Sequence, residues 1–201
     1  MTPLTPEHDE ALYRAWLPDP RRFTYLPFEP FSQPADLVAQ LDRMRSGGSL
    51  VPFAVGRRGH EAEGMVSLMR IDPDNGTVEV GSILYGGDLA GTPATTEAMY
   101  FLGCHVFDVL GYRRYEWKCD SLNAPSLRAA ERLGFRFEGT WRNAVVYKGR
   151  SRDTSWFAMT DQDWPVVKRA MEEWLHPDNL STGSQRRRLE EIRAAIADPR
   201  R

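Results

Sequence analysis

The chain has 201 residues, and its 26 lysines and arginines against 28 aspartates and glutamates give a formal net charge of −2. Hydrophobic residues make up 41% and charged residues 27%, which is the balance of a globular protein and excludes a disordered or fibrous one. This length predicts one domain whose core needs no disulfide, and the near-neutral charge argues against a dedicated nucleic-acid binder. The longest uncharged apolar run, residues 98–107, is far shorter than the roughly 20 residues of a membrane span, so we expect no membrane partner and a cytoplasmic location.

The cysteines and histidines do not form a metal-binding pattern. Cys104 and Cys119 lack the spacing of zinc ligands, and the four histidines are scattered along the chain. We therefore expect no metal, and we interpret both cysteines as reduced thiols in the core.

The first segment, about residues 4–46, is rich in proline and aromatic residues, and its prolines are expected to interrupt any long periodic element before Pro34. From Pro34 a helix is predicted, with Leu37, Leu41 and Met44 on one face and Gly47 as its end. The irregular stretch before it is interpreted in two ways: as an arm beside an active-site groove, or as a cap over the core without functional contacts.

Three strand-like runs follow, at residues 51–57, 64–72 and 77–86. The Asn75–Gly76 pair between the last two favours a tight reversal, so the three runs predict an antiparallel meander. The period then changes to that of a helix over residues 93–111, which ends at Gly111.

The second half of the chain predicts further elements of both kinds. Residues 113–119 alternate like a strand, a helix spans about Ala124–Leu133, residues 135–149 and 153–161 form a hairpin, and a last helix covers residues 161–175. Together these elements predict a mixed α/β fold, a central twisted mixed sheet of about six or seven strands flanked by helices. We expect one domain over residues 1–176, followed by a charged tail, residues 177–201, that forms a solvated helix or an arm contacting a partner.

The best candidate for a ligand site is the junction YGGDLAGTPATTEA, residues 85–98, because in such sheets ligands bind where a strand ends and a helix begins. Its glycines permit a sharp turn. The helix start after them offers free backbone amides to an anion such as a phosphate, namely those of Thr92, Ala94, Thr95 and Thr96. The stretch contains no GxGxxG, and the chain contains no GxxxxGK[ST].

Several motifs in fixed order indicate a family. VEVGSILYG is followed by GTPATTEA, then by LNAPSLRAAERLGFRFEG and by KGRSRDTSWFAMTDQDW. As a set, these motifs resemble the GNAT superfamily of acyl-CoA-dependent N-acyltransferases over roughly residues 10–175, and in particular its RimJ/RimL-like branch of ribosomal-protein acetyltransferases. The family's glycine-rich loop corresponds to residues 90–95, where Gly91 is kept and Pro93 contributes no N–H.

The resemblance implies that acetyl-CoA is the co-substrate and that two segments bind it. Its phosphates would lie against the helix start, at Gly91, Thr92, Ala94, Thr95 and Thr96. Its pantetheine arm and thioester would lie along the preceding strand, at Ser82, Ile83 and Leu84, whose backbone amides would stabilise an oxyanion. Asn123 and Ser126 match the family's Asn-x-x-Ser pair and would also contact the cofactor, although both residues are equally suited to cap a helix.

Two residues are candidates for proton transfer. An amine attacks a thioester only in its neutral form, so a carboxylate or a water that it orders must take the proton, and Glu79 matches the family's frequent base position. The alternative for Glu79 is a cross-strand ion pair. Ser126 is a candidate for protonating the departing thiolate, with Tyr147 and Tyr85 as alternatives.

The function implied is transfer of an acetyl group from acetyl-CoA to a primary amine by direct attack in a ternary complex. The acceptor stays open between a protein N-terminus and a small amine such as a polyamine or an aminoglycoside. A non-catalytic acyl-CoA-binding or regulatory module and an interaction domain without cofactor are the other function classes considered. Assembly as a homodimer, which is frequent among relatives, also stays open.

Overall fold

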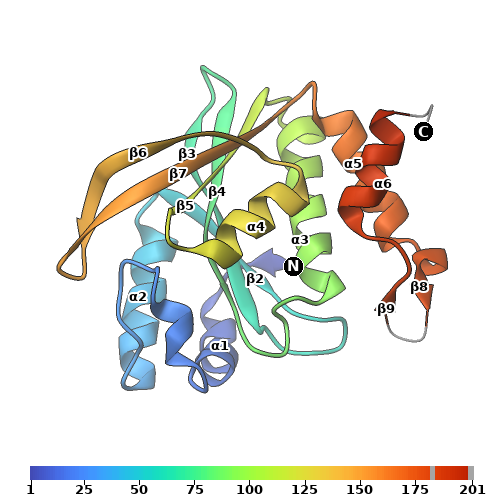
Figure 1. Ribbon diagram of the computed structural model, residues 1–201. Coiled ribbons are helices and arrows are strands. Elements are labelled where there is room, and N and C mark those ends of the chain that lie inside the picture. Colours follow the sequence, from blue (N-terminus) through green and yellow to red (C-terminus); the bar gives the residue numbers. More distant parts are fainter. Residues whose placement is uncertain (182–183, 199–201) are drawn as a thin grey trace.

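The computed structural model describes residues 1–181 and 184–198, and Figure 1 shows helices packed on a central sheet. The described residues form a seven-stranded mixed sheet in the order β1-β2-β3-β4-β5-β7-β6, in which neighbours are antiparallel except for the parallel pair of β4 and β5. The strands are β1 (Thr2–Pro3), β2 (Leu50–Val55), β3 (Gly64–Asp72), β4 (Thr77–Tyr85), β5 (Arg114–Asp120), β6 (Arg136–Tyr147) and β7 (Arg150–Thr160). The predicted fold class and the number of strands are confirmed.

Six α-helices occur in the described residues: α1 (Asp9–Trp16), α2 (Pro34–Ser46), α3 (Pro93–Gly103), α4 (Ala124–Leu133), α5 (Trp164–Leu175) and α6 (Leu189–Ala197). A π-helical turn, Cys104–Val109, continues α3, and together the two cover the single helix expected over residues 93–111. Three short 3-10 helices (Pro6–His8, Pro20–Phe23 and Pro177–Asn179) and a small hairpin of β8 (Leu180–Ser181) and β9 (Ser184–Gln185) complete the described secondary structure.

The two faces of the sheet carry different hydrophobic clusters. On β2, Ala54 packs with α1 and α2, whereas the next residue, Val55, packs with α3 and α5. Met65 and Val66 on β3 divide in the same way. Because successive side chains of a strand point to opposite faces, α1 and α2 cover one face, and α3 to α6 cover the other. We call the latter the helix side of the sheet.

The first segment contains the short helix α1, which was not predicted from the sequence, and no long element precedes Pro34. Pro6 and Pro18 flank this helix rather than interrupt it. Leu12 and Trp16 are almost fully buried against α2, so tertiary packing stabilises a helix that is too short to be stable alone.

The charged tail also differs from the expectation. Leu189 and Ile192 of α6 are each 1% exposed in the same cluster as α3 and α5, so this helix is neither solvated nor free to act as an arm. Arg193 donates from Nη1 to the carbonyl of Arg132 at 2.6 Å and from Nη2 to that of Glu131 at 2.9 Å, which satisfies acceptors at the end of α4. Residues 182–183 and 199–201 of the tail lie outside the described residues.

The pairing of β4 with β5 ends before either strand does. It runs from Thr77 opposite Arg114 to Val80 opposite Trp117, and both strands then continue apart. Just beyond this point the register of β4 against β3 shifts, and Ser82 has a φ of 49°, a left-handed conformation that is uncommon outside glycine and is typical of a bulge. The separated strand ends create the site described next. None of the described helices is long and apolar enough to cross a membrane.

Candidate active site

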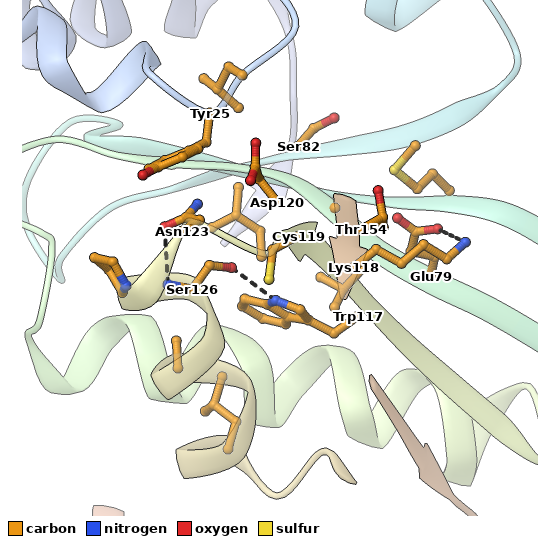
Figure 2. A pocket seen from close by; sticks show the side chains of 18 of the residues that line it. Tyr25, Glu79, Ser82, Trp117, Lys118, Cys119, Asp120, Asn123, Ser126 and Thr154 are labelled. Carbon is orange, nitrogen blue, oxygen red and sulfur yellow. Dashed lines mark hydrogen bonds and ion pairs between the residues drawn. The ribbon is translucent and has the colours of Figure 1, made fainter. Parts of the chain in front are cut away.

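A cavity of about 1100 Å³ opens where β4 and β5 separate (Figure 2). Its walls come from strands β3 to β7, the start of α3, helix α4, and residues 25–28 of the N-terminal segment. Most of the residues expected to form a site line this one cavity: Glu79, Ser82, Ile83, Gly91, Thr92, Thr95, Thr96, Asn123 and Ser126. Leu84 and Ala94 do not line it. The Leu84 side chain is buried in the cluster around α1 and α2, and that of Ala94 packs in the core on the helix side.

The sheet divides the cavity into two compartments. Trp117 and Cys119 of β5 belong to the core on the helix side. Lys118 and Asp120 alternate with them along the strand, so their side chains point to the opposite face of the sheet. We call that opposite compartment the β7 side, because Trp156 and Thr154 of β7 stand directly across from Lys118 and Asp120. Figure 2 shows Asn123 and Ser126 at the start of α4 near Trp117, whereas Glu79 and Lys118 lie together away from α4.

On the helix side, the turn into α3 leaves some backbone amides free. The N–H groups of Gly91 and Ala94 have no acceptor within residues 1–181 and 184–198. The N–H of Thr92 donates to the carbonyl of Leu89 at 3.2 Å, and that of Thr95 to the carbonyl of Thr92 at 3.2 Å, so these two expected anion donors are used within the turn itself.

The start of α4 holds two polar side chains at the cavity. Asn123 is the N-cap, and its Oδ1 accepts from the N–H of Ser126 at 3.3 Å. Ser126 Oγ in turn accepts from Trp117 Nε1 at 3.0 Å. Asn123 therefore caps the helix and lines the cavity at once, whereas Ser126 lines the cavity and its side chain makes no capping hydrogen bond. Arg128, further along α4, also lines the cavity, and its side chain has no hydrogen bond or ion pair in the described part of the chain.

Glu79 projects into the β7 side with only 6% of its surface exposed. Its Oε2 lies 2.7 Å from Lys118 Nζ and 3.1 Å from Arg70 Nε. The Lys118 ammonium lies 3.6 Å from the centroid of the Trp156 ring, a cation–π contact, and 3.5 Å from Glu116. The cross-strand ion pair expected as the alternative role of Glu79 is therefore present, and the carboxylate lines the cavity as well.

The two alternative proton donors are placed differently. Tyr147 does not line the cavity, and its hydroxyl donates to Asp120 at 2.7 Å. Burial, together with this carboxylate, raises the pKa of Tyr147 to about 12. Tyr85 lines the cavity, and its buried hydroxyl has no hydrogen-bond partner in the described ranges. Burial raises the pKa of Tyr85 as well, so both tyrosines are protonated at neutral pH.

Asp120, which sequence reasoning did not single out, is the centre of a buried network at the end of β5. It is 1% exposed and accepts hydrogen bonds from the N–H of Leu122, from Tyr147 and from Arg150. Burial alone would raise the pKa of Asp120, but these three hydrogen bonds outweigh it and hold the pKa below its ordinary value. Asp120 thus fixes the turn from β5 into α4.

The N-terminal segment closes one wall of the cavity. Tyr25 donates to the carbonyl of Leu122 at 2.8 Å, and Lys148 donates to the carbonyl of Phe23 at 2.8 Å. These two bonds tie the segment to the β5–α4 turn and to the turn between β6 and β7. Of the two interpretations of this stretch, the arm beside a groove describes residues 25–28, whereas Trp16 and Phe23 are buried in the core.

Within the described residues, no three histidines, cysteines, aspartates or glutamates gather as a metal site. Both cysteine thiols, at Cys104 and Cys119, are free, and burial raises their pKa, which disfavours the nucleophilic thiolate.

Comparison with known proteins identifies the family. Residues 1–136 match the family model described as "Acetyltransferase (GNAT) domain", so the chain belongs to the GNAT acetyltransferases. A GCN5-related N-acetyltransferase from Brucella melitensis is 43% identical and superposes with a TM-score of 0.92 over 96% of this chain and 89% of that one. The protein "Uncharacterized N-acetyltransferase p20" of Bacillus licheniformis is 28% identical over 79% of this chain and 90% of its own length.

One more distant structure has a named substrate. The spermidine N-acetyltransferase of Vibrio cholerae, solved in complex with CoA and spermine, has a TM-score of 0.65 at 15% identity over 81% of this chain and 95% of that one. At this level of identity the likeness shows a shared fold.

Proposed function

We propose that this acetyltransferase moves an acetyl group from acetyl-CoA to a primary amine by direct attack within a ternary complex. The observation that carries the proposal is that Glu79 and Ser126 line one cavity from opposite faces of the sheet. Acyl transfer to an amine needs a proton acceptor on the side of the nucleophile and a proton donor on the side of the leaving group. Glu79 would be the proton acceptor on the β7 side, and Ser126 would be the proton donor on the helix side.

The helix side suits the CoA moiety. The free amide of Gly91, which lines the cavity before the positive end of α3, would bind a phosphate oxygen, and Arg128 would supply a charge for a further phosphate. Thr92 and Thr95, which were also expected to bind phosphate, would only contact the cofactor at the cavity wall, because their amides donate hydrogen bonds within the turn. Acetyl-CoA supplies the thioester, and Asn123 and the bulged segment at Ser82 and Ile83 would hold it between the strands.

Ser126 is the proposed proton donor. Its oxygen accepts from Trp117, and its own O–H, which lies within reach of the Cys119 thiol, would be donated toward the departing thiolate. Tyr85 remains as an alternative on the cavity wall, but Tyr147 is committed to Asp120 outside that wall.

On the β7 side, Glu79 would accept the proton of the attacking amine, directly or through an ordered water. The amine is proposed to reach it past the aromatic wall of Tyr25, Phe28 and Trp141. The proposed acceptor is a protein N-terminus or a small amine, and the spermine bound by the Vibrio cholerae protein of the same fold is a reason to include a polyamine in the test.

A thiol-release assay tests the proposal. Acetyl-CoA is incubated with the protein and with a panel of peptides and small amines, and mass spectrometry of the acceptor confirms N-acetylation. Release that depends on an amine supports the proposal. CoA binding without release with any amine would instead favour a non-catalytic acyl-CoA-binding module.

A further inference from the structure

Three polar side chains of β7 point into the cavity with hydrogen bonds unmade. Arg152, Thr154 and Trp156 alternate along the strand, so they share one face, and all three line the β7 side. Each has a buried polar atom without a hydrogen-bond partner in the described part of the chain: Arg152 Nε, Thr154 Oγ1 and Trp156 Nε1. Thr154 is only 5% exposed. Buried polar groups are nearly always paired, so three in one row indicate that a ligand or solvent completes them.

The chemistry of this row, which we call the β7 stripe, is that of a donor surface. The guanidinium and indole N–H groups can only donate, and the threonine hydroxyl can donate as well. Neighbouring members are about 7 Å apart, the distance between alternate residues of a strand. A ligand group that satisfies them must be rich in acceptors.

The charges around the stripe favour an anionic group. Every acidic side chain that lines this side has a basic partner: Glu79 pairs with Lys118 and Arg70, and Asp120 pairs with Arg150. Arg152 has no ion pair in the described ranges, and its guanidinium carbon lies 5.8 Å from the centroid of the Tyr147 ring. This compartment therefore contains a surplus cation, which would repel a polyamine.

We propose that the acceptor amine carries an oxyanion, a carboxylate or a phosphate, which the β7 stripe binds while Glu79 receives the proton of the amine. This inference rests on the proposed acetyl transfer and names its substrate class. A planar guanidinium binds a carboxylate or phosphate in two parallel hydrogen bonds, and Thr154, the next member of the stripe, would donate a further one.

The test compares acceptors of similar size: β-alanine and phosphoethanolamine as the two anionic sources, propylamine as a neutral reference and putrescine as a dication. In the wild type, kcat/KM is expected to be highest for one of the anionic amines, and the better of the two identifies the oxyanion. In Arg152→Met, the ratio of kcat/KM for that amine over propylamine is expected to fall about ten- to hundredfold. Thr154→Val should lower the same ratio by a smaller factor.

Arg58→Met is the matched control, because Arg58 is exposed and lies outside the cavity, so it removes one positive charge without touching the stripe. Thermal unfolding and CoA affinity are measured for every variant to separate misfolding from loss of the subsite. A preference for propylamine or putrescine over both anions would overturn the proposal, as would equal losses for all acceptors in Arg152→Met.

A binding experiment separates this inference from the proposed function. Calorimetry of β-alanine and phosphoethanolamine with CoA present needs no turnover. Binding that Arg152→Met abolishes supports the stripe even if no acetylation occurs, whereas absence of binding in the wild type refutes the stripe even if another amine is acetylated.

Discussion

Trp117 Nε1 donates a hydrogen bond to Ser126 Oγ at 3.0 Å, which joins β5 to the start of α4 at the cavity. The indole can only donate, so the bond fixes the serine oxygen as acceptor and leaves its proton available. Ser126 is the residue that would touch the leaving group, and Trp117 would position it.

Ser126→Ala is expected to lower kcat about a hundredfold, the lower end of the range for general acid catalysis, with little change in CoA affinity. Trp117→Phe should lower kcat less. Because Trp117 acts through Ser126, the double variant should be no slower than Ser126→Ala alone. Steady-state kinetics with CoA titrations measure all three, and an unchanged kcat in Ser126→Ala would remove this residue from the mechanism.

Glu79→Gln is expected to lower kcat about a hundredfold or more at neutral pH, where the amine is mostly protonated. The defect should shrink as the pH approaches the pKa of the amine, because less help with deprotonation is then needed. The matched control is Glu116→Gln, which also removes a carboxylate beside Lys118 but lies outside the cavity. A pH–rate profile distinguishes the roles: a loss that is constant with pH would indicate a structural ion pair.

Gly91→Trp is expected to weaken CoA binding at least about tenfold by filling the space in front of the α3 amides. Gly91 has a φ of +78°, and a Cβ added to it would meet no atom within 4 Å, so the backbone strain of about 1 kcal/mol is tolerable. Gly59→Trp is an apt control, because Gly59 has a φ of +79° and the same open surroundings away from the cavity. Isothermal titration with CoA that gave equal affinities for both variants would contradict the assignment of this turn.

Asp120→Asn is expected to destabilise the fold by about 2–3 kcal/mol near neutral pH, because charge-assisted hydrogen bonds become neutral ones. The folded-state pKa of Asp120 lies below its ordinary value of 3.8, so its stabilising contribution is present above that value and is lost as the pH falls through the lower folded-state pKa. The difference in free energy of unfolding between wild type and variant should therefore narrow below about pH 4. Urea titrations at a series of pH values measure it, and a difference that grew with acid would refute the assignment.

Leu189→Ala is expected to lower the free energy of unfolding by about 2–5 kcal/mol, because it creates a cavity where α6 meets the main core. The neighbouring exposed Glu190→Ala should change it by about 0.5 kcal/mol or less. Chemical denaturation compares the two, and equal small effects would show that α6 is dispensable for the fold.

The sequence predicted the sheet well because alternation and turn residues are local signals. The runs predicted at residues 51–57, 64–72 and 77–86 correspond to β2, β3 and β4. Helix α4 begins after Asn123 and ends before Gly134, as the sequence predicts. Helix α1 was missed, because its stability comes from α2 and not from its own short pattern. The interpretation of the tail as solvated was wrong for the same reason. Its charged residues are visible in the sequence, but the burial of Leu189 and Ile192 depends on α3 and α5, which are distant in the chain.

The candidate site was predictable only in part. The motifs predict that Glu79, Ser126 and the α3 turn belong to one site, and all three line the same cavity. The pairing of Glu79 with Lys118 could not be predicted, because it depends on the parallel register of β4 and β5, which no local pattern specifies. The β7 stripe depends likewise on which face of β7 meets the cavity. In the sequence, the alternation of residues 152, 154 and 156 indicates only that their side chains share one face of a strand. Whether that face lines a cavity depends on the strands that pair with β7.

The wall around Tyr25 has a consequence for biosynthesis. It is held by Leu122 and Lys148, which are far from it in the chain. A nascent polypeptide that has emerged from the ribosome only through α4 already contains the α3 turn and Ser126, but it lacks the hairpin that anchors this wall. The wall that we propose for acceptor entry therefore lacks its Lys148 anchor until residue 148 has left the ribosome.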